Sequence, residues 1–170
     1  DGETGKKKQR PFVAVLLVIK KKGKYLLYYR KKEPFFDFYG LPGAKVEFGE
    51  DIISCAKREL LEETGLEGDC EIKSVINFRI KENNLLLSHF TQFVVFFEDP
   101  KGELIEENRE GNYTFVNSLE FFKKNEEGVL FPDNLVIFKN LKKDSGFNFY
   151  EMSFNVVDSK FTDFKCKKIC

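Results

Sequence analysis

The sequence contains no tryptophan and only one histidine, and its 28 basic and 28 acidic residues leave a formal net charge of +0. A neutral chain has no general attraction for nucleic acid or for an acidic membrane surface. The single histidine, His89, gives no support to a catalytic triad. We therefore expect no stable nucleic-acid complex and no membrane partner.

Long hydrophobic runs are also missing. An apolar run covers residues 13–19, and three lysines follow it directly. It is too short for a membrane-spanning helix, and no small-residue cleavage site of a signal peptide follows it. The run predicts a buried strand, and we expect a cytoplasmic domain. The polar residues 1–10 before it are expected to form a flexible tail.

Cysteines are few, and their spacing is uninformative. Cys166 and Cys170 are close in sequence, but no second pair completes a zinc site. We expect reduced thiols, as is usual inside cells. By contrast, the chain has 20 phenylalanines and is 42% hydrophobic, which suffices for the core of one domain. We interpret the phenylalanines as core and sheet residues, and not as a platform for RNA.

The most informative stretch covers residues 43–66 and reads GAKVEFGEDIISCAKRELLEETGL. Glu59, Glu62 and Glu63 have the i, i+3, i+4 spacing that places side chains on one face of a helix. Carboxylates that converge raise one another's pKa values, which favours a bound cation. Mg²⁺ prefers such oxygen ligands. The spacing therefore predicts three carboxylates converging on a magnesium site.

The ends and the buried face of this helix can also be predicted. Asp51 is suited to cap its N-terminus, and Gly65 is suited to end it in a left-handed conformation. Ile53, Ala56 and Leu60 recur at roughly helical spacing. We expect this stripe to pack on a sheet and to leave the carboxylates facing outward.

The same stretch resembles the Nudix box, whose family pattern is G-x5-E-x7-R-E-U-x-E-E-x-G-U, with U an aliphatic residue. Ala44 stands where the pattern begins with glycine. The resemblance implies a Nudix hydrolase that cleaves a nucleoside diphosphate linked to another group, with Mg²⁺ as cofactor and Mn²⁺ as an alternative ion. The matching residues are Glu50, Arg58, Glu59, Leu60, Glu62, Glu63, Gly65 and Leu66.

The resemblance also implies roles for these residues. The glutamates Glu59, Glu62 and Glu63 would hold the metal and act in catalysis, and the backbone carbonyl of Ala44 would be a further ligand. Glu50 would support the site. Arg58, a further catalytic residue, is expected to pair with Glu59 and orient it. If position 44 needs a positive φ, alanine costs about 1 kcal/mol in strain.

Three features outside the box bear on the substrate. Residues 109–111, Arg-Glu-Gly, are similar to a segment of the triphosphate-cleaving branch of the family, which makes Glu110 a candidate ligand or general base. The alternatives are that Glu110 is an ordinary loop acid, or that Glu106 or Glu107 has this role. Residues 131–134, Phe-Pro-Asp-Asn, resemble a loop of the same branch whose asparagine pairs with a purine edge, a role that suits the Asn134 amide. The alternative is that Asp133 or Asn134 only caps the last helix. Arg30 either meets a phosphate or the nucleoside, or is simply exposed.

The element order resembles the Nudix fold, an α/β fold with a mixed β-sheet sandwiched between α-helices, here at residues 11–143. Residues 144–170 are expected to form a C-terminal β-hairpin that extends a sheet edge, covers the substrate or makes a homodimer contact. Strands are predicted at residues 12–19, 25–29, 71–80, 86–97 and 112–116, and helices at 118–124 and from 132 to about 142.

Together these features predict a Mg²⁺-dependent pyrophosphohydrolase that acts on a small-molecule nucleotide. The first candidate substrate is a nucleoside triphosphate, including an oxidised purine deoxynucleotide. The alternative enzyme is an ADP-ribose or nucleotide-sugar pyrophosphatase. The alternative of another class is a regulatory Nudix domain that binds a nucleotide without cleaving it.

Overall fold

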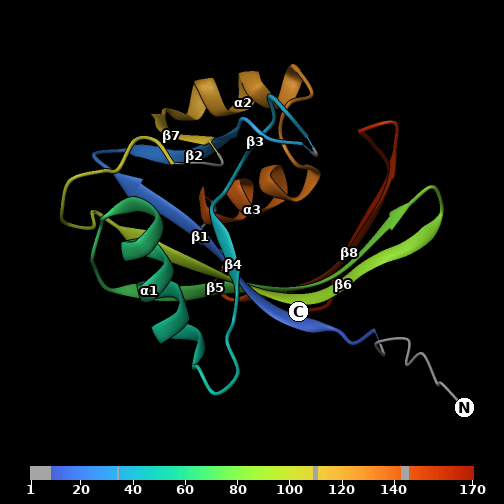
Figure 1. Cartoon of the computed structure of the whole chain (residues 1–170), viewed down its shortest axis with the longest axis horizontal. Coiled ribbons are helices and arrows are strands. Elements are labelled where there is room, and N and C mark those ends of the chain that lie inside the picture. Colours follow the sequence, from blue (N-terminus) through green and yellow to red (C-terminus); the bar gives the residue numbers. More distant parts are fainter. Residues whose placement is uncertain (1–8, 34, 109–110, 143–145) are drawn as a thin grey trace, which may run out of the picture.

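The computed structural model describes residues 9–33, 35–108, 111–142 and 146–170, and it shows a mixed sheet with helices on both faces (Figure 1). Most of the expected tail lies outside the described residues. The predicted elements are present, with ends within about three residues of their expected positions. The helices are α1 (Ile52–Thr64), α2 (Ser118–Glu126) and α3 (Pro132–Lys142). The strands are β1 (Phe12–Lys21), β2 (Lys24–Arg30), β3 (Tyr39–Gly40), β4 (Gly43–Lys45), β5 (Cys70–Glu82), β6 (Leu85–Glu98), β7 (Gly111–Val116), β8 (Asn148–Val157) and β9 (Lys160–Lys168).

The strands form one sheet in the order β3-β2-β1-β6-β5-β8-β9, with β4 paired to β1 and β7 paired to β2. The pairs β1–β6 and β5–β8 are parallel, and the remaining pairs are antiparallel. Lys22 and Gly23 both have positive φ at the turn between β1 and β2, as a two-residue hairpin turn requires. The expected mixed sheet between helices is confirmed.

Strand β1 is buried on both faces, which explains its unbroken apolar run. Val15, Leu17 and Ile19 face the core beneath α1. Leu16 and Val18 face the core beneath α2 and α3. Because successive side chains of a strand point to opposite faces, one continuous run serves both layers. Full burial of each such side chain stabilises the fold by about 1.5–3 kcal/mol.

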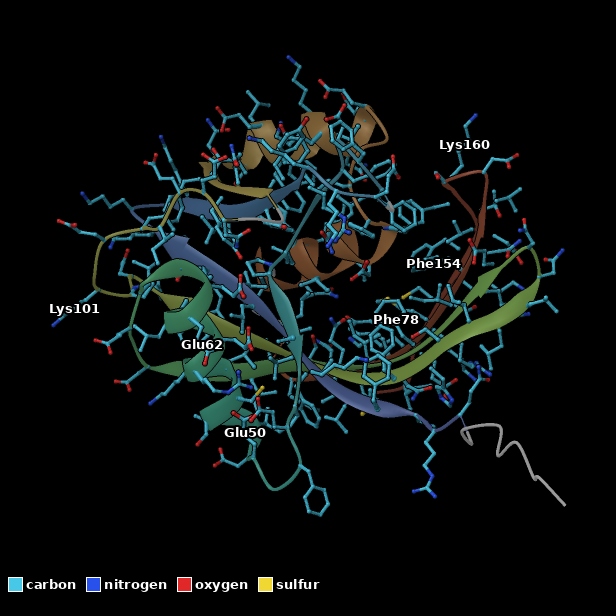
Figure 2. The ribbon with its side chains drawn as sticks, in the orientation of Figure 1. Glu50, Glu62, Phe78, Lys101, Phe154 and Lys160 are labelled. Carbon is cyan, nitrogen blue, oxygen red and sulfur yellow. The ribbon has the colours of Figure 1, made fainter. Side chains whose placement is uncertain are left out.

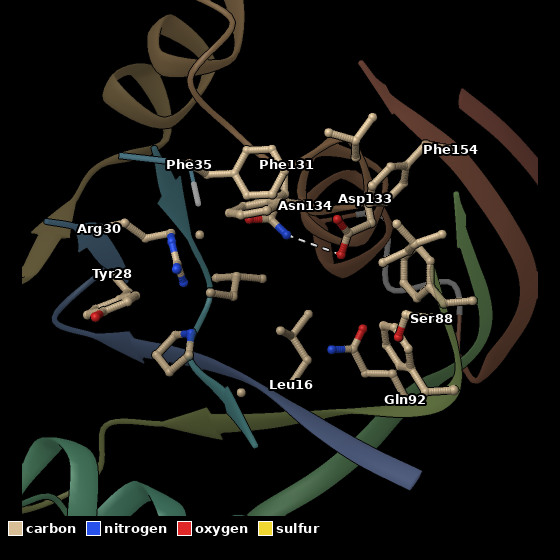
Figure 3. A pocket seen from close by; sticks show the side chains of 18 of the residues that line it. Leu16, Tyr28, Arg30, Phe35, Ser88, Gln92, Phe131, Asp133, Asn134 and Phe154 are labelled. Atoms are coloured by element: carbon tan, nitrogen blue, oxygen red, sulfur yellow. Dashed lines mark hydrogen bonds between the residues drawn. The ribbon is translucent and has the colours of Figure 1, made fainter. Parts of the chain in front are cut away.

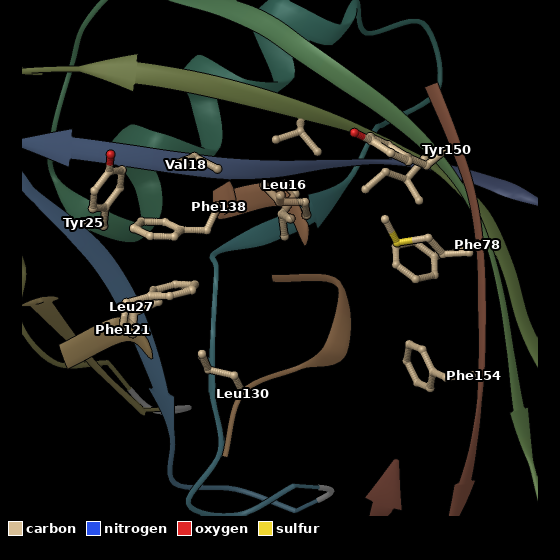
Figure 4. Packing of buried hydrophobic residues seen from close by; sticks show 14 of the residues in the cluster. Leu16, Val18, Tyr25, Leu27, Phe78, Phe121, Leu130, Phe138, Tyr150 and Phe154 are labelled. Atoms are coloured by element: carbon tan, nitrogen blue, oxygen red, sulfur yellow. The ribbon is translucent and has the colours of Figure 1, made fainter. Parts of the chain in front are cut away.

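Phenylalanines fill much of the core beneath α2 and α3 (Figure 4). The rings of Phe121 and Phe138 stack with centroids 4.2 Å apart, and Phe78 is 2% exposed. These positions confirm the prediction of core and sheet residues. Others, including Phe131 and Phe154, also line a cavity next to this core, a role that the sequence did not indicate.

The C-terminal hairpin β8–β9 extends the sheet, because β8 pairs with β5 in parallel. The hairpins β5–β6 and β8–β9 run side by side away from α1 (Figure 1). Asn83 and Asn84 form the β5–β6 turn with positive φ, and the Asn84 and Asn155 side chains are hydrogen-bonded at 3.1 Å. Phe154 and Val156 of β8 line the cavity. The hairpin therefore extends the sheet edge, and its residues form part of the cavity wall.

Candidate functional site

Helix α1 begins and ends where the sequence predicted. The Asp51 Oδ1 atom accepts a hydrogen bond from the backbone N–H of Ser54 at 2.8 Å. Gly65 has φ 75°, and its N–H donates to the carbonyl of Leu61 at 2.9 Å. Both terminal turns of the helix are thereby satisfied.

The buried face of α1 differs slightly from the predicted stripe. Ala56 and Leu60 are fully buried, as expected. Ile53 does not belong to this core cluster, and Ile52 and Cys55 contact it instead. Residues 52, 55, 56 and 60 share one side of the helix, and residue 53 lies just past the edge of this arc, about 20° beyond residue 60.

Arg58 lies at the centre of the acidic face. Its guanidinium donates to both carboxylate oxygens of Glu50, from Nε at 2.6 Å and from Nη2 at 3.0 Å. The Nη1 atom donates to Glu59 at 2.7 Å and to Glu62 at 3.2 Å. The expected pair with Glu59 is therefore present, and the two-pronged contact with Glu50 is additional. The Arg58 bond lowers the pKa of Glu50 to about 2.

Glu59 is held in a more buried setting. Its side chain is only 13% exposed, and burial raises the pKa of Glu59, against the lowering effect of Arg58. The neighbouring charges of Glu63 and Glu62 raise this pKa further. An added positive charge would therefore relieve repulsion at this position.

Glu63 is held separately, by neutral donors. Its Oε2 atom accepts hydrogen bonds from the Tyr113 hydroxyl at 2.8 Å and from the Asn108 amide at 3.1 Å. Burial, with the bond to Glu63, raises the pKa of Tyr113 well above its usual value, so the phenol remains a donor. No ion pair involves Glu63 within the described ranges.

The three carboxylates share a face of α1 but do not meet at one point, which corrects the predicted convergence. Among the residues that the structure describes, no three His, Cys, Asp or Glu side chains are grouped to hold a metal ion. The reason is physical: Arg58 draws Glu59 and Glu62 toward itself, while Tyr113 holds Glu63.

The residues nevertheless fit a divalent cation by their chemistry. Glu47, Glu50, Glu59 and Glu62 lie within 4 Å of Arg58, and Glu63 lies on the same helix. Four carboxylates around one guanidinium, with a fifth on the same helix, leave a strong excess of negative charge. Carboxylate oxygens are the ligands that Mg²⁺ prefers.

Ala44 lies in β4 opposite Val15 of β1. It is not among the described residues with positive φ, so the strain considered for alanine at this position is absent. Glycine is needed instead at Gly43, where an added Cβ would lie 2.9 Å from the carbonyl oxygen of Val15. A Cβ atom does not normally lie so close to a carbonyl oxygen, so only glycine fits at position 43 without a shift of the backbone.

A cavity of about 590 Å³ lies between the sheet and α3 (Figure 3), and Glu63 is one of its lining residues. Arg30 and Asn134 line it, so it brings together three predicted site residues from β2, α1 and α3. Glu50 and Glu62 are not among its lining residues. Glu62 lies on α1 and Glu50 just before it, both away from Phe78 and Phe154 (Figure 2). Glu110 lies outside the described residues.

Asn134 is 2% exposed, and its Oδ1 atom has no hydrogen-bond partner in the described part of the chain. An N-cap side chain would use that oxygen to accept a backbone N–H. The alternative that Asn134 only caps α3 is therefore wrong. Its neighbour Asp133 is buried, and this burial raises the pKa of Asp133 to about 6.

Four residues of this region were missed from the sequence: Asn108 and Tyr113, which hold Glu63, and Gln92 and Asp133, which line the cavity. Gln92 did carry a signal, because it interrupts an apolar row on one face of β6. The bonds of Asn108 and Tyr113 to Glu63 span 45 and 50 residues of sequence, and no local pattern indicates such contacts.

The sheet between helices, with an acid-rich helix beside a nucleotide-sized cavity, defines the class of Nudix-type α/β domains. The sequence model of the NUDIX domain matches residues 8–137, and the chain belongs to this family. The predicted family and fold are thereby confirmed.

Known relatives agree with this assignment. The chain is 33% identical over 111 residues to an ADP-ribose pyrophosphatase of Methanocaldococcus jannaschii, a match that covers 64% of this chain and 64% of that relative's length. The crystal structure of the mMutator MutT protein of Bacillus halodurans superposes with a TM-score of 0.75 at 20% identity, covering 92% and 97% of the two chains.

A second solved structure is the NUDIX domain of Shewanella oneidensis NrtR, complexed with ADP ribose. Its TM-score is 0.64 at 15% identity, over 79% of this chain and 88% of that one. At these identities the two structures establish the fold alone. Separately, none of the described helices is long and apolar enough to cross a membrane.

Proposed function

We propose that the chain is a metal-dependent hydrolase that cleaves the pyrophosphate bond of a nucleoside diphosphate derivative, with ADP-ribose as the first substrate. The observation that carries this proposal is the position of Glu63 on the same cavity as Arg30 and Asn134. A carboxylate, a cation and an amide then face one nucleotide-sized space. The ADP-ribose pyrophosphatase among the relatives supports the choice of substrate.

Each of these residues would have a separate role in the reaction. Glu59, Glu62 and Glu63, with the carbonyl of Ala44, would hold Mg²⁺ or Mn²⁺, which neutralises phosphate charge and lowers the pKa of the attacking water. Arg58 keeps the surrounding acids oriented. Tyr113 and Asn108 position Glu63 at the cavity edge. Arg30 lines the cavity and would bind a phosphate oxygen.

A nucleoside triphosphate is the second candidate substrate, because Asn134 follows Phe131 in the segment that resembles the triphosphate-cleaving branch. This prediction differs from the first in its products. Water added to ADP-ribose gives AMP and ribose 5-phosphate, whereas water added between the α- and β-phosphates of a triphosphate gives a monophosphate and pyrophosphate.

The test is a panel of ADP-ribose, purine and pyrimidine triphosphates and a nucleotide sugar, each with Mg²⁺ or Mn²⁺ and with a chelator as control. We expect AMP from ADP-ribose, with turnover lost in the chelator. Pyrophosphate from triphosphates alone would select the second substrate. Nucleotide binding without turnover of any compound would overturn the enzymatic proposal and favour a regulatory binding domain.

A further inference from the structure

The two oxygens of the Glu63 carboxylate have different surroundings. Its Oε2 atom accepts hydrogen bonds from the Tyr113 hydroxyl at 2.8 Å and from the Asn108 amide at 3.1 Å. Its Oε1 atom makes no hydrogen bond or ion pair within the described ranges. Each carboxylate oxygen offers about two lone-pair sites. The two donors therefore saturate Oε2, and Oε1 is the oxygen that remains for a further ligand.

Both donors are held in place by contacts of their own. Tyr113 is 6% exposed, and the centroid of its ring lies 5.1 Å from that of Tyr28. The Oδ1 atom of Asn108 accepts a hydrogen bond from the backbone N–H of Gly111 at 3.2 Å, while the amide nitrogen of the same side chain donates to Glu63. The carboxylate is thus fixed by two oriented donors, which oppose its rotation.

The other acids of this helix face are held by a charged donor. The Nη1 atom of Arg58 donates one bond to an oxygen of Glu59 at 2.7 Å and one to an oxygen of Glu62 at 3.2 Å. A single bond leaves lone pairs on both oxygens of each carboxylate, and the guanidinium offsets part of their charge. Glu63 has the opposite setting, because its donors are neutral. It keeps its full charge for a cation but has only one oxygen to offer.

The number of oxygens that a carboxylate offers bears on which cation it suits. Mg²⁺ demands near-ideal octahedral geometry, whereas Ca²⁺ accepts more ligands and often binds both oxygens of one carboxylate. We propose that Tyr113 and Asn108 restrict Glu63 to coordination through one oxygen, and that they thereby favour Mg²⁺ or Mn²⁺ over Ca²⁺. This inference rests on the proposed function and deepens it, since it assigns the choice of ion to two residues outside α1.

The test measures ion binding in the absence of any nucleotide. The electron paramagnetic resonance signal of free Mn²⁺ reports its binding, and Mg²⁺ and Ca²⁺ are titrated as competitors. Tyr113→Phe keeps the ring and removes one donor to Oε2, which frees a lone pair for a second contact with a large cation. We expect the ratio of the Ca²⁺ Kd to the Mg²⁺ Kd to fall about 10-fold, a usual size for the loss of a partner of a metal ligand.

Tyr150→Phe is the matched control. Tyr150 is a buried tyrosine of β8, 4% exposed, in the core beneath α2 and α3, and its hydroxyl accepts a hydrogen bond from Asn140. The change removes a buried hydroxyl of the same kind but should leave the ratio unchanged, because lost stability weakens the binding of every ion alike.

A second variant tests whether Tyr113 acts through Glu63. In a chain that already carries Glu63→Gln, Tyr113→Phe should no longer change the ratio, because the carboxylate that Tyr113 restricts is gone. A change of ratio that persists in this double variant overturns the proposal.

The outcomes separate this proposal from the proposed function. Metal-dependent hydrolysis together with an unchanged ratio in Tyr113→Phe overturns the selection and leaves the enzyme intact. An equal loss of affinity for all three ions means that Tyr113 only orients Glu63, and it also overturns the selection. A lowered ratio in a chain that hydrolyses no nucleotide supports the selection and overturns the enzymatic proposal.

Discussion

A single guanidinium organises the acids of α1. Arg58 contacts Glu50 with two nitrogens and shares a third between Glu59 and Glu62. A lysine at position 58 would present one point charge and could not make this planar, forked contact. This geometry explains why the family pattern has an arginine at the position of Arg58. The acids around α1 need a donor whose N–H groups point in several fixed directions.

Glu63 is the carboxylate whose charge can be removed with least disturbance. In Glu63→Gln the remaining amide oxygen can still accept from Tyr113 and Asn108, so we expect an unchanged fold. If Glu63 binds the metal, kcat should fall about 100-fold or more. Steady-state kinetics and circular dichroism measure the two effects.

The matched control is Glu71→Gln, because Glu71 is an exposed glutamate of β5, 64% exposed and paired with Lys73. It should leave kcat within about twofold, since surface changes of this kind have small effects. A folded Glu63→Gln variant with near-normal turnover would falsify the assignment of Glu63 to the metal site.

The sequence indicated the helix face that the acids share, but not the side chains that hydrogen-bond to them. Helical spacing placed Glu59, Glu62 and Glu63 on one face, as the structure shows. It did not indicate that Tyr113 would donate a hydrogen bond to Glu63 while Arg58 pairs with the other two. The contact of Tyr113 depends on the pairing of β7 with β2, a long-range contact that sets where Tyr113 lies.

At the scale of the elements, β4 is a short strand that leads from β3 into α1. Its register places Gly43 against Leu16 and Ala44 against Val15. Gly43 leaves no room for a Cβ against the backbone of β1. The position of β4, and with it the backbone that precedes α1, therefore depends on this glycine.

The two residues of β4 can be tested as a matched pair. We expect Gly43→Ala to lower the free energy of unfolding by about 1–3 kcal/mol, because the added carbon overpacks against the Val15 carbonyl, and to lower kcat as β4 shifts. Ala44→Gly should change kcat by a few-fold at most and cost about 1 kcal/mol or less. Denaturant unfolding and kinetics measure both.

If Ala44→Gly changed stability and kcat more than Gly43→Ala does, the glycine of the family pattern would be required at position 44. If Ala44→Gly restored turnover to an inert parent, the chain would be a domain that had lost catalysis. If Gly43→Ala matched the wild type in both measurements, the close approach of β4 and β1 would have relaxed at no cost.

At the scale of the whole molecule, the order of helices and strands could be predicted because a local sequence pattern marks each of them. The run in β1, the Asn83–Asn84 turn and the Pro132 start of α3 all follow from neighbouring residues. The side-by-side hairpins were not predicted as a pair. The Asn84–Asn155 bond that joins them spans 71 residues, and the cavity that they enclose was missed for the same reason.

The buried carboxyl of Asp133 should make the stability of the whole molecule depend on pH. Burial raises the pKa of Asp133 to about 6, from an unfolded value of about 4. Between these values the folded chain binds more protons than the unfolded chain, so the free energy of unfolding falls as pH rises. The contribution is fully favourable below pH 4 and is lost above pH 6, a change of about 3 kcal/mol at most.

Asp133→Asn removes this titration while keeping the shape of the side chain. We expect the difference in free energy of unfolding, variant minus wild type, to grow in favour of the variant from pH 4 to pH 6 and then to level off. Using the difference cancels the opposite trend of Glu50, whose lowered pKa makes stability fall in acid. Asp158→Asn, at an exposed turn, should show a flat difference over this window. A flat difference for Asp133→Asn as well would mean that Asp133 ionises in the fold as readily as in the unfolded chain.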